Sequence, residues 1–304
     1  MSQSPFQSPS QSIGTANLLR LVLLGAIWGG SFLFMRVSVP AFGPVLLIFL
    51  RVAVGALFLW LVCRALALSR MDLTQWRHYL VIGLFNSALP FTLFAWGAQR
   101  ASASLLSIMN STAPIWGTLI GMLWLKAPAT RQSLLGQLFG IVGVAVIVGG
   151  NLRAGDTEQL LPMLACLGAT CCYGISGTYT RWAKLKLDPL DMAHGSLWAA
   201  TLCLAPLALA SPIRQTPDPL QWASLGGLGV LCTGAAFLLY FRLIRDCGAP
   251  RALTVTFLIP VFGVLWGALL LGETVTPTTL AGGALVLLGT ALANGLVAWP
   301  GRRG

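Results

Sequence analysis

Long runs of hydrophobic residues, separated by short polar gaps, occupy almost the whole chain. A helix needs about 20 apolar residues to cross a bilayer, and runs of roughly this length recur from end to end. Prolines such as Pro44, Pro128 and Pro277 mark the gaps between them. The pattern predicts ten transmembrane helices over residues 18–39, 44–64, 76–97, 101–125, 132–150, 159–180, 189–210, 220–241, 249–271 and 278–298.

Composition supports an all-α integral membrane protein. Of 304 residues, 56% are hydrophobic and 9% are charged, against roughly 25% charged residues in soluble domains. A single soluble core stops growing beyond about 250–300 residues, so this much apolar surface needs lipid as a second solvent. Residues 1–17 are uncharged and rich in Ser, Gln and Pro, which predicts a disordered cytoplasmic N-terminus.

The net charge of +11 does not indicate nucleic-acid binding, because the basic residues fall in gaps between apolar runs rather than among exposed aromatics. Loops on the cytoplasmic side of a membrane carry an excess of Lys and Arg. With a cytoplasmic N-terminus, the outer side holds only Arg36, Arg51, Arg100, Arg153 and Arg214, and the inner side holds the other fourteen of 19. We therefore expect a multi-pass protein of the cell inner membrane with both termini, including the tail 299–304, in the cytoplasm.

The sequence repeats itself at an offset of 146 residues. The matched pairs are Gly83 and Gly229, Phe91 and Phe237, Pro114 and Pro260, Gly117 and Gly263, Gly121 and Gly267, Thr130 and Thr276, Gly136 and Gly282, and Gly143 and Gly289. The repeats cover residues 18–152 and 153–298, with five helices each. Because five is odd, the second repeat starts from the opposite side of the membrane, so the two repeats are inverted. Inverted repeats around a midplane site are typical of secondary transporters.

Several motifs give the chain a family resemblance. They are Trp28-Gly29-Gly30-Ser31-Phe32, Leu50-Arg51, Pro114 with Gly117 and Gly121, Pro260-Val261-Phe262-Gly263, and Leu271-Gly272-Glu273. With these motifs, residues 18–298 resemble the drug/metabolite transporter superfamily, in its ten-helix EamA-type branch. The resemblance implies export of amino acids, other metabolites or drugs. The family's Gly-Glu ending is missing from the first repeat, which reads Leu125-Lys126-Ala127.

Polar and aromatic residues at membrane depth are candidates for a substrate site, since polar groups there are expensive and should face a cavity. The candidate substrate-binding residues are Asn86, Trp96, Asn110, Ser111, Thr112, Trp116, Tyr173, Tyr240, Thr254 and Thr256, with Trp28 and Ser31 as further aromatic or polar wall. The alternative is that hydroxyl groups bond to their own backbone and aromatics lie at the lipid interface. Pro114 and Pro260 are predicted to kink their helices. The kinks either lie beside the site or serve helix packing alone.

Three ionisable residues are candidates for gating or coupling. Arg51, about seven residues or roughly 10 Å into its helix, either extends to the outer surface, pairs structurally or binds a carboxylate; we favour the first two. His194 lies one turn from Asp191, where a helix-end cap is a simpler interpretation than proton coupling. Glu273 closes the ninth helix as a gate or a structural residue.

The predicted function is export of small organic solutes by secondary transport with alternating access. The site is expected near the midplane, between the third and fourth helices of one half and the eighth and ninth of the other. An intramembrane enzyme and a passive channel are the alternatives. The chain has no phosphate-binding glycine loop and no metal-ligand spacing, so no cofactor or metal is expected. The expected partners are a small-molecule substrate and membrane lipid, and no nucleic acid is expected to bind. We expect a monomer or a homodimer.

Overall fold

Ten membrane-crossing segments make up the fold of the computed structural model, which describes residues 14–68, 71–128, 130–153, 158 and 160–293. Six of the ten are single helices in the described residues: α1 (Thr15–Phe42), α2 (Pro44–Leu66), α7 (Arg131–Arg153), α8 (Leu160–Trp182), α9 (Pro189–Leu209) and α14 (Pro277–Ala293). The predicted all-α fold with ten crossings is confirmed.

The other four crossings are interrupted, two in each repeat. The third consists of α3 (Trp76–Gly83), the π-helical turn η2 (Leu84–Ala88) and α4 (Leu89–Gly97), after a short 3-10 turn η1 (Leu73–Gln75). The fourth consists of α5 (Ala103–Asn110) and α6 (Ala113–Leu125). The eighth consists of α10 (Pro219–Gly226), the π-helical stretch η4 (Gly227–Ala235) and α11 (Ala236–Cys247), and the ninth of α12 (Ala249–Ala252) and α13 (Val255–Leu271).

The π-helical interruption recurs at an equivalent place in the two halves, since the offset of 146 carries η2 onto residues 230–234, inside η4. The breaks at Ser111–Thr112 and Leu253–Thr254 divide the fourth and ninth crossings, about one helical turn away from exact equivalence. Next to each break a threonine hydroxyl bonds back to its own helix, from Thr112 to the Met109 carbonyl oxygen at 2.8 Å and from Thr254 to the Arg251 carbonyl oxygen at 2.6 Å. Broken helices and π-turns are tolerated in membranes where the freed backbone groups find other partners.

Two boundary predictions need correction. Helix α1 begins at Thr15, so the last residues of the segment predicted to be disordered are helical; residues 1–13 and 299–304 lie outside the described residues. The first helix was predicted to end at residue 39, but α1 continues through Pro40 to Phe42. Pro114 does not kink a continuous helix: it stands in the first turn of α6, where its missing N–H costs nothing.

Glycine contacts demonstrate the two-fold relation between the repeats. In the α7–α14 pair, a Cβ added at Gly136 would lie 2.6 Å from the Gly289 carbonyl oxygen, and one added at Gly143 would lie 2.6 Å from the Gly282 carbonyl oxygen. The offset exchanges Gly136 with Gly282 and Gly143 with Gly289, so each contact is the image of the other. Such an exchange is the signature of inverted repeats around a pseudo-two-fold axis in the membrane plane.

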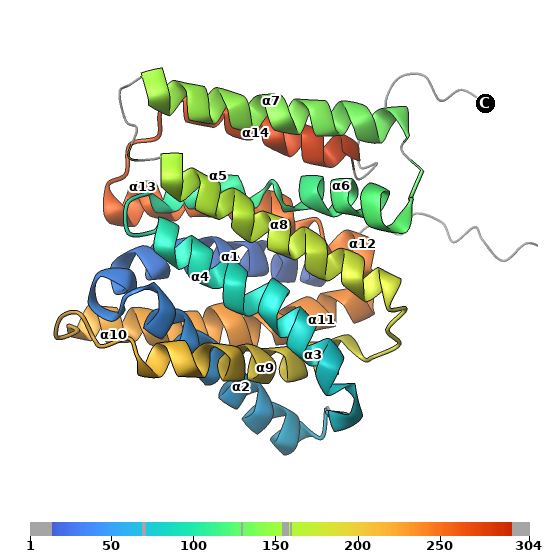
Figure 1. The fold of residues 1–304 in the computed structure, drawn as a ribbon, viewed down its shortest axis with the longest axis vertical. Coiled ribbons are helices and arrows are strands. Elements are labelled where there is room, and N and C mark those ends of the chain that lie inside the picture. The colour runs from blue at the N-terminus through green and yellow to red at the C-terminus, as the bar shows by residue number, and fades with distance from the viewer. Residues whose placement is uncertain (1–13, 69–70, 129, 154–157, 159, 294–304) are drawn as a thin grey trace, which may run out of the picture.

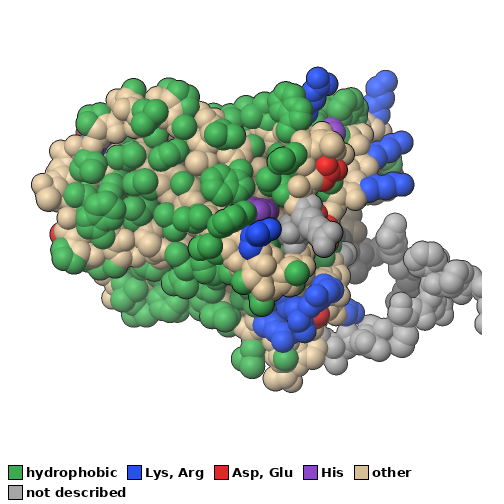
Figure 2. All heavy atoms as spheres, turned by 90° about the horizontal axis from the view of Figure 1, so that it is seen from below, with side chains coloured by type: hydrophobic (Ala, Val, Ile, Leu, Met, Phe, Trp, Pro, Cys, Tyr) green, Lys and Arg blue, Asp and Glu red, His purple; other side chains and the backbone are tan. Residues whose placement is uncertain are grey.

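The surface is that of a membrane protein. Seven helical segments are long and apolar enough to span a bilayer, with mean hydropathy from 1.4 to 2.6. Hydrophobic side chains cover much of the face drawn in Figure 2, whereas Lys and Arg gather toward one end. We call this end the basic face; it carries Arg64, Arg181, Lys186, Arg242 and Arg245, where α2, α8 and α11 end. The opposite end, where α13 ends and α5 begins, is the Glu273 face (Figure 1).

Candidate functional site

A cavity of about 380 Å³ lies among the crossings of both repeats. This volume is within the roughly 300–1,000 Å³ of small-molecule sites. Its lining residues are Trp28, Ser31, Phe32, Met35, Arg51, Asn86, Phe91, Phe94, Asn110, Ala113, Pro114 and Gly117 from the first repeat, and Tyr173, Gly174, Cys232, Phe237, Tyr240, Leu253, Val255, Thr256 and Ile259 from the second. A second cavity, of about 670 Å³, lies at the Glu273 face among Arg36, Arg100, Glu273 and their neighbours.

The two repeats line the first cavity with equivalent positions. Six pairs separated by 146 residues contribute both members to the lining: Trp28 and Gly174, Asn86 and Cys232, Phe91 and Phe237, Phe94 and Tyr240, Asn110 and Thr256, and Ala113 and Ile259. A cavity bounded by both members of six such pairs must lie on the pseudo-two-fold axis. We call it the axial cavity. The second cavity has no such pairs in its lining and lies off the axis.

Arg51 is the charged side chain of the axial cavity, and it is 4% exposed. Its Nε donates to Thr233 Oγ1 at 3.1 Å and its Nη2 to Ser31 Oγ at 3.2 Å. Its Nη1 lies 3.8 Å from Met35 Sδ, and its Cζ stands 3.9 Å above the Phe91 ring centroid. Of the interpretations given above for Arg51, extension to the outer surface is therefore wrong, because neutral groups on three neighbouring elements, α1, α4 and η4, hold the guanidinium inside.

Aromatic rings and free amides form the rest of the wall. The Trp28 and Tyr240 ring centroids are 5.3 Å apart, and those of Phe94 and Tyr173 are 6.4 Å apart. Asn110 ends α5 at the break, so the break places its amide in the cavity. The side chains of Asn86 and Asn110 make no hydrogen bond within the described part of the chain. Their amides are therefore available to a ligand.

The axial cavity brings together half of the predicted substrate-binding residues. Asn86, Asn110, Tyr173, Tyr240 and Thr256 line it, together with the predicted gating residue Arg51 and the predicted kink Pro114. Thr256 Oγ1 also donates to the Leu253 carbonyl oxygen at 2.8 Å. Pro260 is buried within α13 and does not reach the lining.

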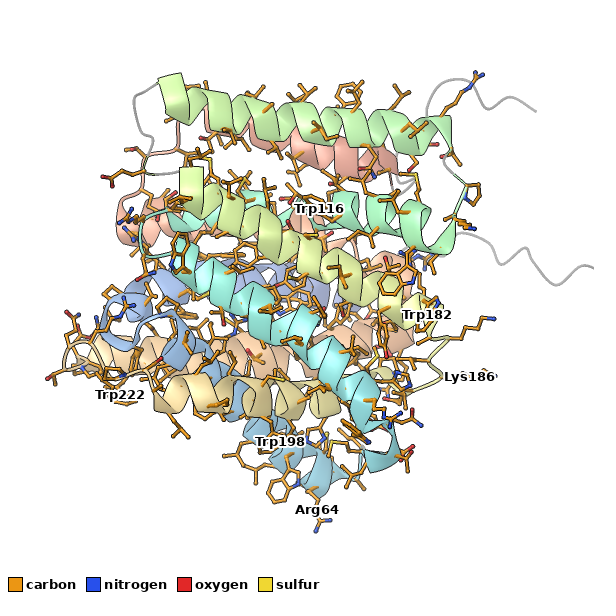
Figure 3. The ribbon with its side chains drawn as sticks, viewed as in Figure 1. Arg64, Trp116, Trp182, Lys186, Trp198 and Trp222 are labelled. Carbon is orange, nitrogen blue, oxygen red and sulfur yellow. The ribbon has the colours of Figure 1, made fainter. Side chains whose placement is uncertain are left out.

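The other five predicted substrate-binding residues do not line the axial cavity. Trp96 is 42% exposed on α4. Thr112 Oγ1 shares a hydrogen bond of 2.9 Å with Thr170 Oγ1 between α5–α6 and α8. Thr254 bonds to its own backbone, as the alternative interpretation expected. Ser111 is buried. Trp116, labelled in Figure 3, packs with its backbone and Cβ against Gly174 of α8.

The two remaining ionisable candidates also lie off the axial cavity. His194 is buried in α9, where its Nε2 accepts a hydrogen bond of 3.1 Å from Trp198 Nε1. Glu273 follows α13 and accepts hydrogen bonds from Ala103 N at 2.7 Å, Ser104 N at 2.9 Å and Ser104 Oγ at 2.6 Å. Its carboxylate thus caps the N-terminus of α5, where the helix dipole also favours an anion.

Sequence reasoning missed several apolar lining residues. They are Phe32, Met35, Phe91, Phe94, Cys232 and Phe237. The repeat offset held a signal for two of them, because it carries Asn86 onto Cys232 and Tyr240 back onto Phe94. Among the described residues, no group of three or more His, Cys, Asp or Glu has a metal-binding arrangement.

Comparison with known proteins agrees with this geometry. The model of the EamA-like transporter family matches the chain twice, over residues 16–149 and 160–295. The chain is 26% identical to the S-adenosylmethionine/S-adenosylhomocysteine transporter of Chlamydia trachomatis, covering 90% of this chain and 87% of that protein. It is 24% identical to a probable terminal-alkyne amino-acid exporter of Streptantibioticus cattleyicolor, covering 90% and 92%.

A solved crystal structure has the same fold, with a TM-score of 0.63 at 19% identity over 93% of this chain and 98% of that one. The relatives are transporters, so the alternative of an intramembrane enzyme is excluded. With two matched repeats, an axial cavity and a multi-pass membrane fold, the chain belongs to the EamA-like transporter family and is a transporter of small solutes.

Proposed function

We propose that the protein is a secondary transporter that exports small organic solutes containing an α-amino acid group, by alternating access. The observation that carries this proposal is the axial cavity, which equivalent positions of two inverted repeats enclose. Each repeat can adopt the conformation of the other, so one cavity can open first to one face and then to the opposite face.

The asymmetry between the two faces supports a moving gate. At the Glu273 face, α5 packs closely on α13, and the Glu273 carboxylate bonds the two together. The repeat-related pair at the basic face is α6 and α12, which has no comparable packing among the described residues. We assign Glu273 as the gate that closes its face while the cavity communicates with the basic face.

The solute class follows from two relatives with stated substrates. One is described as an amino-acid exporter and the other as a transporter of S-adenosylmethionine and S-adenosylhomocysteine. All of these compounds have an α-carboxylate and an α-amine on one carbon. The axial cavity offers a guanidinium for the first and aromatic faces for the second.

Charge distribution supports the orientation. Basic residues concentrate at one face (Figure 2), and the positive-inside rule places such a face in the cytoplasm. An even number of crossings then puts both termini in the cytoplasm of a cell whose inner membrane holds the protein.

Flux in proteoliposomes tests the proposal against the remaining alternative, a passive channel. We expect saturable uptake of at least one radiolabelled amino acid or S-adenosylmethionine, and faster uptake when the same unlabelled solute is loaded inside. A carrier shows this counter-exchange because the loaded cavity reorients faster than the empty one. Uptake that rises linearly with concentration and ignores internal solute would contradict alternating access.

A further inference from the structure

The axial cavity contains a positive charge with no negative partner in contact with it. None of the ion pairs among the described residues includes Arg51; all three involve Asp246 at the basic face. Every contact that the structure gives the Arg51 guanidinium is with a hydroxyl, a thioether or a phenyl ring. No Asp, Glu, Lys or His lines the cavity.

A buried charge of this kind is costly unless something pairs with it. A guanidinium has five N–H donors, and the three contacts to Thr233, Ser31 and Met35 use three of them. Donors are left over on a side chain that is fixed from three sides and borders an open volume of about 380 Å³. The arrangement satisfies the side chain enough to hold it in place but leaves its charge uncompensated.

We propose that Arg51 binds the carboxylate of the transported solute, so that the substrates are organic carboxylates with an apolar or zwitterionic body. This inference rests on the proposed transport function. The guanidinium fork matches a carboxylate in geometry and charge, and such charge-assisted bonds are strong where water is scarce. Amines and lipophilic cations without a carboxylate are excluded, because the same charge repels them.

The rest of the cavity suits the rest of such a solute. The unbonded amides of Asn86 and Asn110 accept or donate hydrogen bonds to an α-amine or a polar side chain. The faces of Trp28 and Tyr240, 5.3 Å apart, receive an apolar body or an ammonium group.

The repeat symmetry fixes the polarity of the bound solute. The position related to Arg51 by the offset is Leu197, which is fully buried and does not line the cavity. Charge therefore enters from one repeat only, whereas the amide and aromatic positions come in pairs. A carboxylate binds at the first-repeat end of the site, whichever face the cavity opens to.

Binding of four matched probes to the purified protein tests the assignment: L-phenylalanine, 3-phenylpropionate, L-phenylalaninamide and 2-phenylethylamine. The first two have a carboxylate and the last two do not, while the ring is the same. Tryptophan fluorescence reports binding, because Trp28 lines the cavity. We expect the wild-type protein to bind at least one carboxylate probe at least tenfold more tightly than either amine probe. Equal or reversed preference, or no binding of any probe, would overturn the proposal without requiring any variant to fold.

Substitution then ties the preference to one side chain. Arg51→Gln should reduce carboxylate affinity at least tenfold and leave amine affinity unchanged or higher, whereas Arg51→Lys should retain part of it. Arg64→Gln is the matched control, since Arg64 is on the same helix but exposed at the basic face; it should behave like the wild type. Carboxylate preference that survives Arg51→Gln would also contradict the proposal.

A transport assay of the same variants separates this inference from the proposed function. Saturable flux with counter-exchange but no preference for carboxylates would leave the transporter in place and remove the role of Arg51. Tight binding of carboxylates without flux of any probe would retain the site and contradict the carrier mechanism.

Discussion

The two faces of the molecule are built from related segments but are closed by different chemistry. At the Glu273 face, one carboxylate accepts three hydrogen bonds from the start of α5. Nearby, Arg36 Nη1 donates to the Ala98 carbonyl oxygen at 2.7 Å, and Arg214 Nη1 donates to Gln99 Oε1 at 2.6 Å. These bonds join segments that are far apart in the sequence. Phe42, at the same end of α1, is buried.

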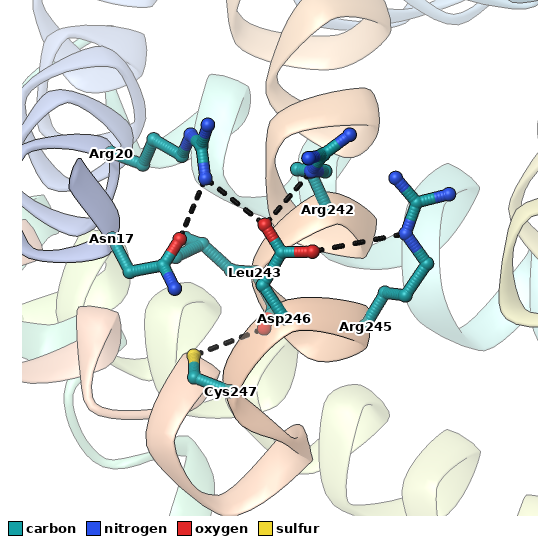
Figure 4. A network of polar contacts seen from close by, with 7 residues as sticks. All are labelled: Asn17, Arg20, Arg242, Leu243, Arg245, Asp246 and Cys247. Carbon is teal, nitrogen blue, oxygen red and sulfur yellow. Dashed lines mark hydrogen bonds and ion pairs between the residues drawn. The ribbon is translucent and has the colours of Figure 1, made fainter. Parts of the chain in front are cut away.

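At the basic face, an ion-pair cluster around Asp246 connects two of the crossings (Figure 4). Asp246 Oδ2 accepts from Arg20 at 3.0 Å, across from α11 to α1, and from Arg242 at 2.8 Å within α11. The side chains of these arginines are 35% and 50% exposed. Exposed pairs of this kind add little to stability. The comparison teaches that crossings are joined by a carboxylate on backbone N–H groups at one face and by exposed ion pairs at the other.

The sequence accounts for this difference on both sides of the contact between Glu273 and the start of α5. The position related to Glu273 is Ala127, so the basic face lacks the acceptor. The positions related to Ala103 and Ser104 are Ala249 and Pro250, so it also lacks one backbone N–H and the hydroxyl group. A symmetric backbone thus carries a carboxylate contact of this kind at one face and not at the other.

Replacement of Glu273 should have the largest effect on this comparison. Glu273→Leu leaves two backbone N–H groups and a hydroxyl without their acceptor, and each hydrogen bond to a charged group contributes about 1.5–3 kcal/mol. We expect at least a tenfold loss of the conformation closed at the Glu273 face, seen as faster maleimide labelling, from that side, of a cysteine placed at Ser107, which is fully buried on α5. Glu273→Gln, which retains one carbonyl acceptor, should give an intermediate rate. Unchanged labelling in both variants would show that Glu273 is not the gate.

Restoring the missing acid should have a smaller effect in the opposite direction. In Ala127→Glu, the new carboxylate can accept from the backbone N–H of Ala249 but finds no second N–H at Pro250. Because position 127 is exposed to solvent, we take this bond to contribute only roughly 1 kcal/mol, which should shift the equilibrium about fivefold toward closure of the basic face. The labelling rate of a cysteine at Asn110 from the basic face measures this shift. Ala127→Gln is the control for side-chain size, and an equal shift in that control would assign the effect to bulk.

Loss of the ion-pair cluster should have the smallest effect. Asp246→Asn removes the exposed pairs with Arg20 and Arg242, and we expect less than a threefold change in the transport rate. Salt screens exposed charges over about 8–10 Å at physiological ionic strength, so the wild type and the variant should become indistinguishable in 0.5 M salt. A tenfold change that persists in high salt would mean that the basic face is closed as firmly as the opposite one.

The sequence predicted the scaffold better than the site. Hydrophobic run length and the offset of 146 residues identified ten crossings and two inverted repeats, since lipid imposes the first and glycine contacts such as Gly136–Gly289 require the second. Asn86 and Asn110 were correctly placed on a cavity, because an unbonded amide has few other places at membrane depth.

The misplaced residues show what a linear pattern does not contain. Thr112 and Thr254 bond within or between helices, which depends on where the breaks fall. Trp96 faces outward because it lies two residues after Phe94, which lines the cavity, and two residues are more than half a helical turn. For Arg51 the sequence left open extension to the surface, structural pairing or carboxylate binding, because the hydroxyl groups that hold it come from α1 and η4, far away in the sequence.

The most direct test of the account is a pair of distances measured by double electron–electron resonance in the same reconstituted protein. One pair of spin labels, at Ala127 and Arg251, spans the basic face, and the other, at Arg100 and Thr274, spans the Glu273 face. On addition of a transported solute, we predict a population in which the first distance shortens while the second lengthens. Two distances that stay fixed under saturating solute, or that lengthen together, would contradict alternating access around the axial cavity.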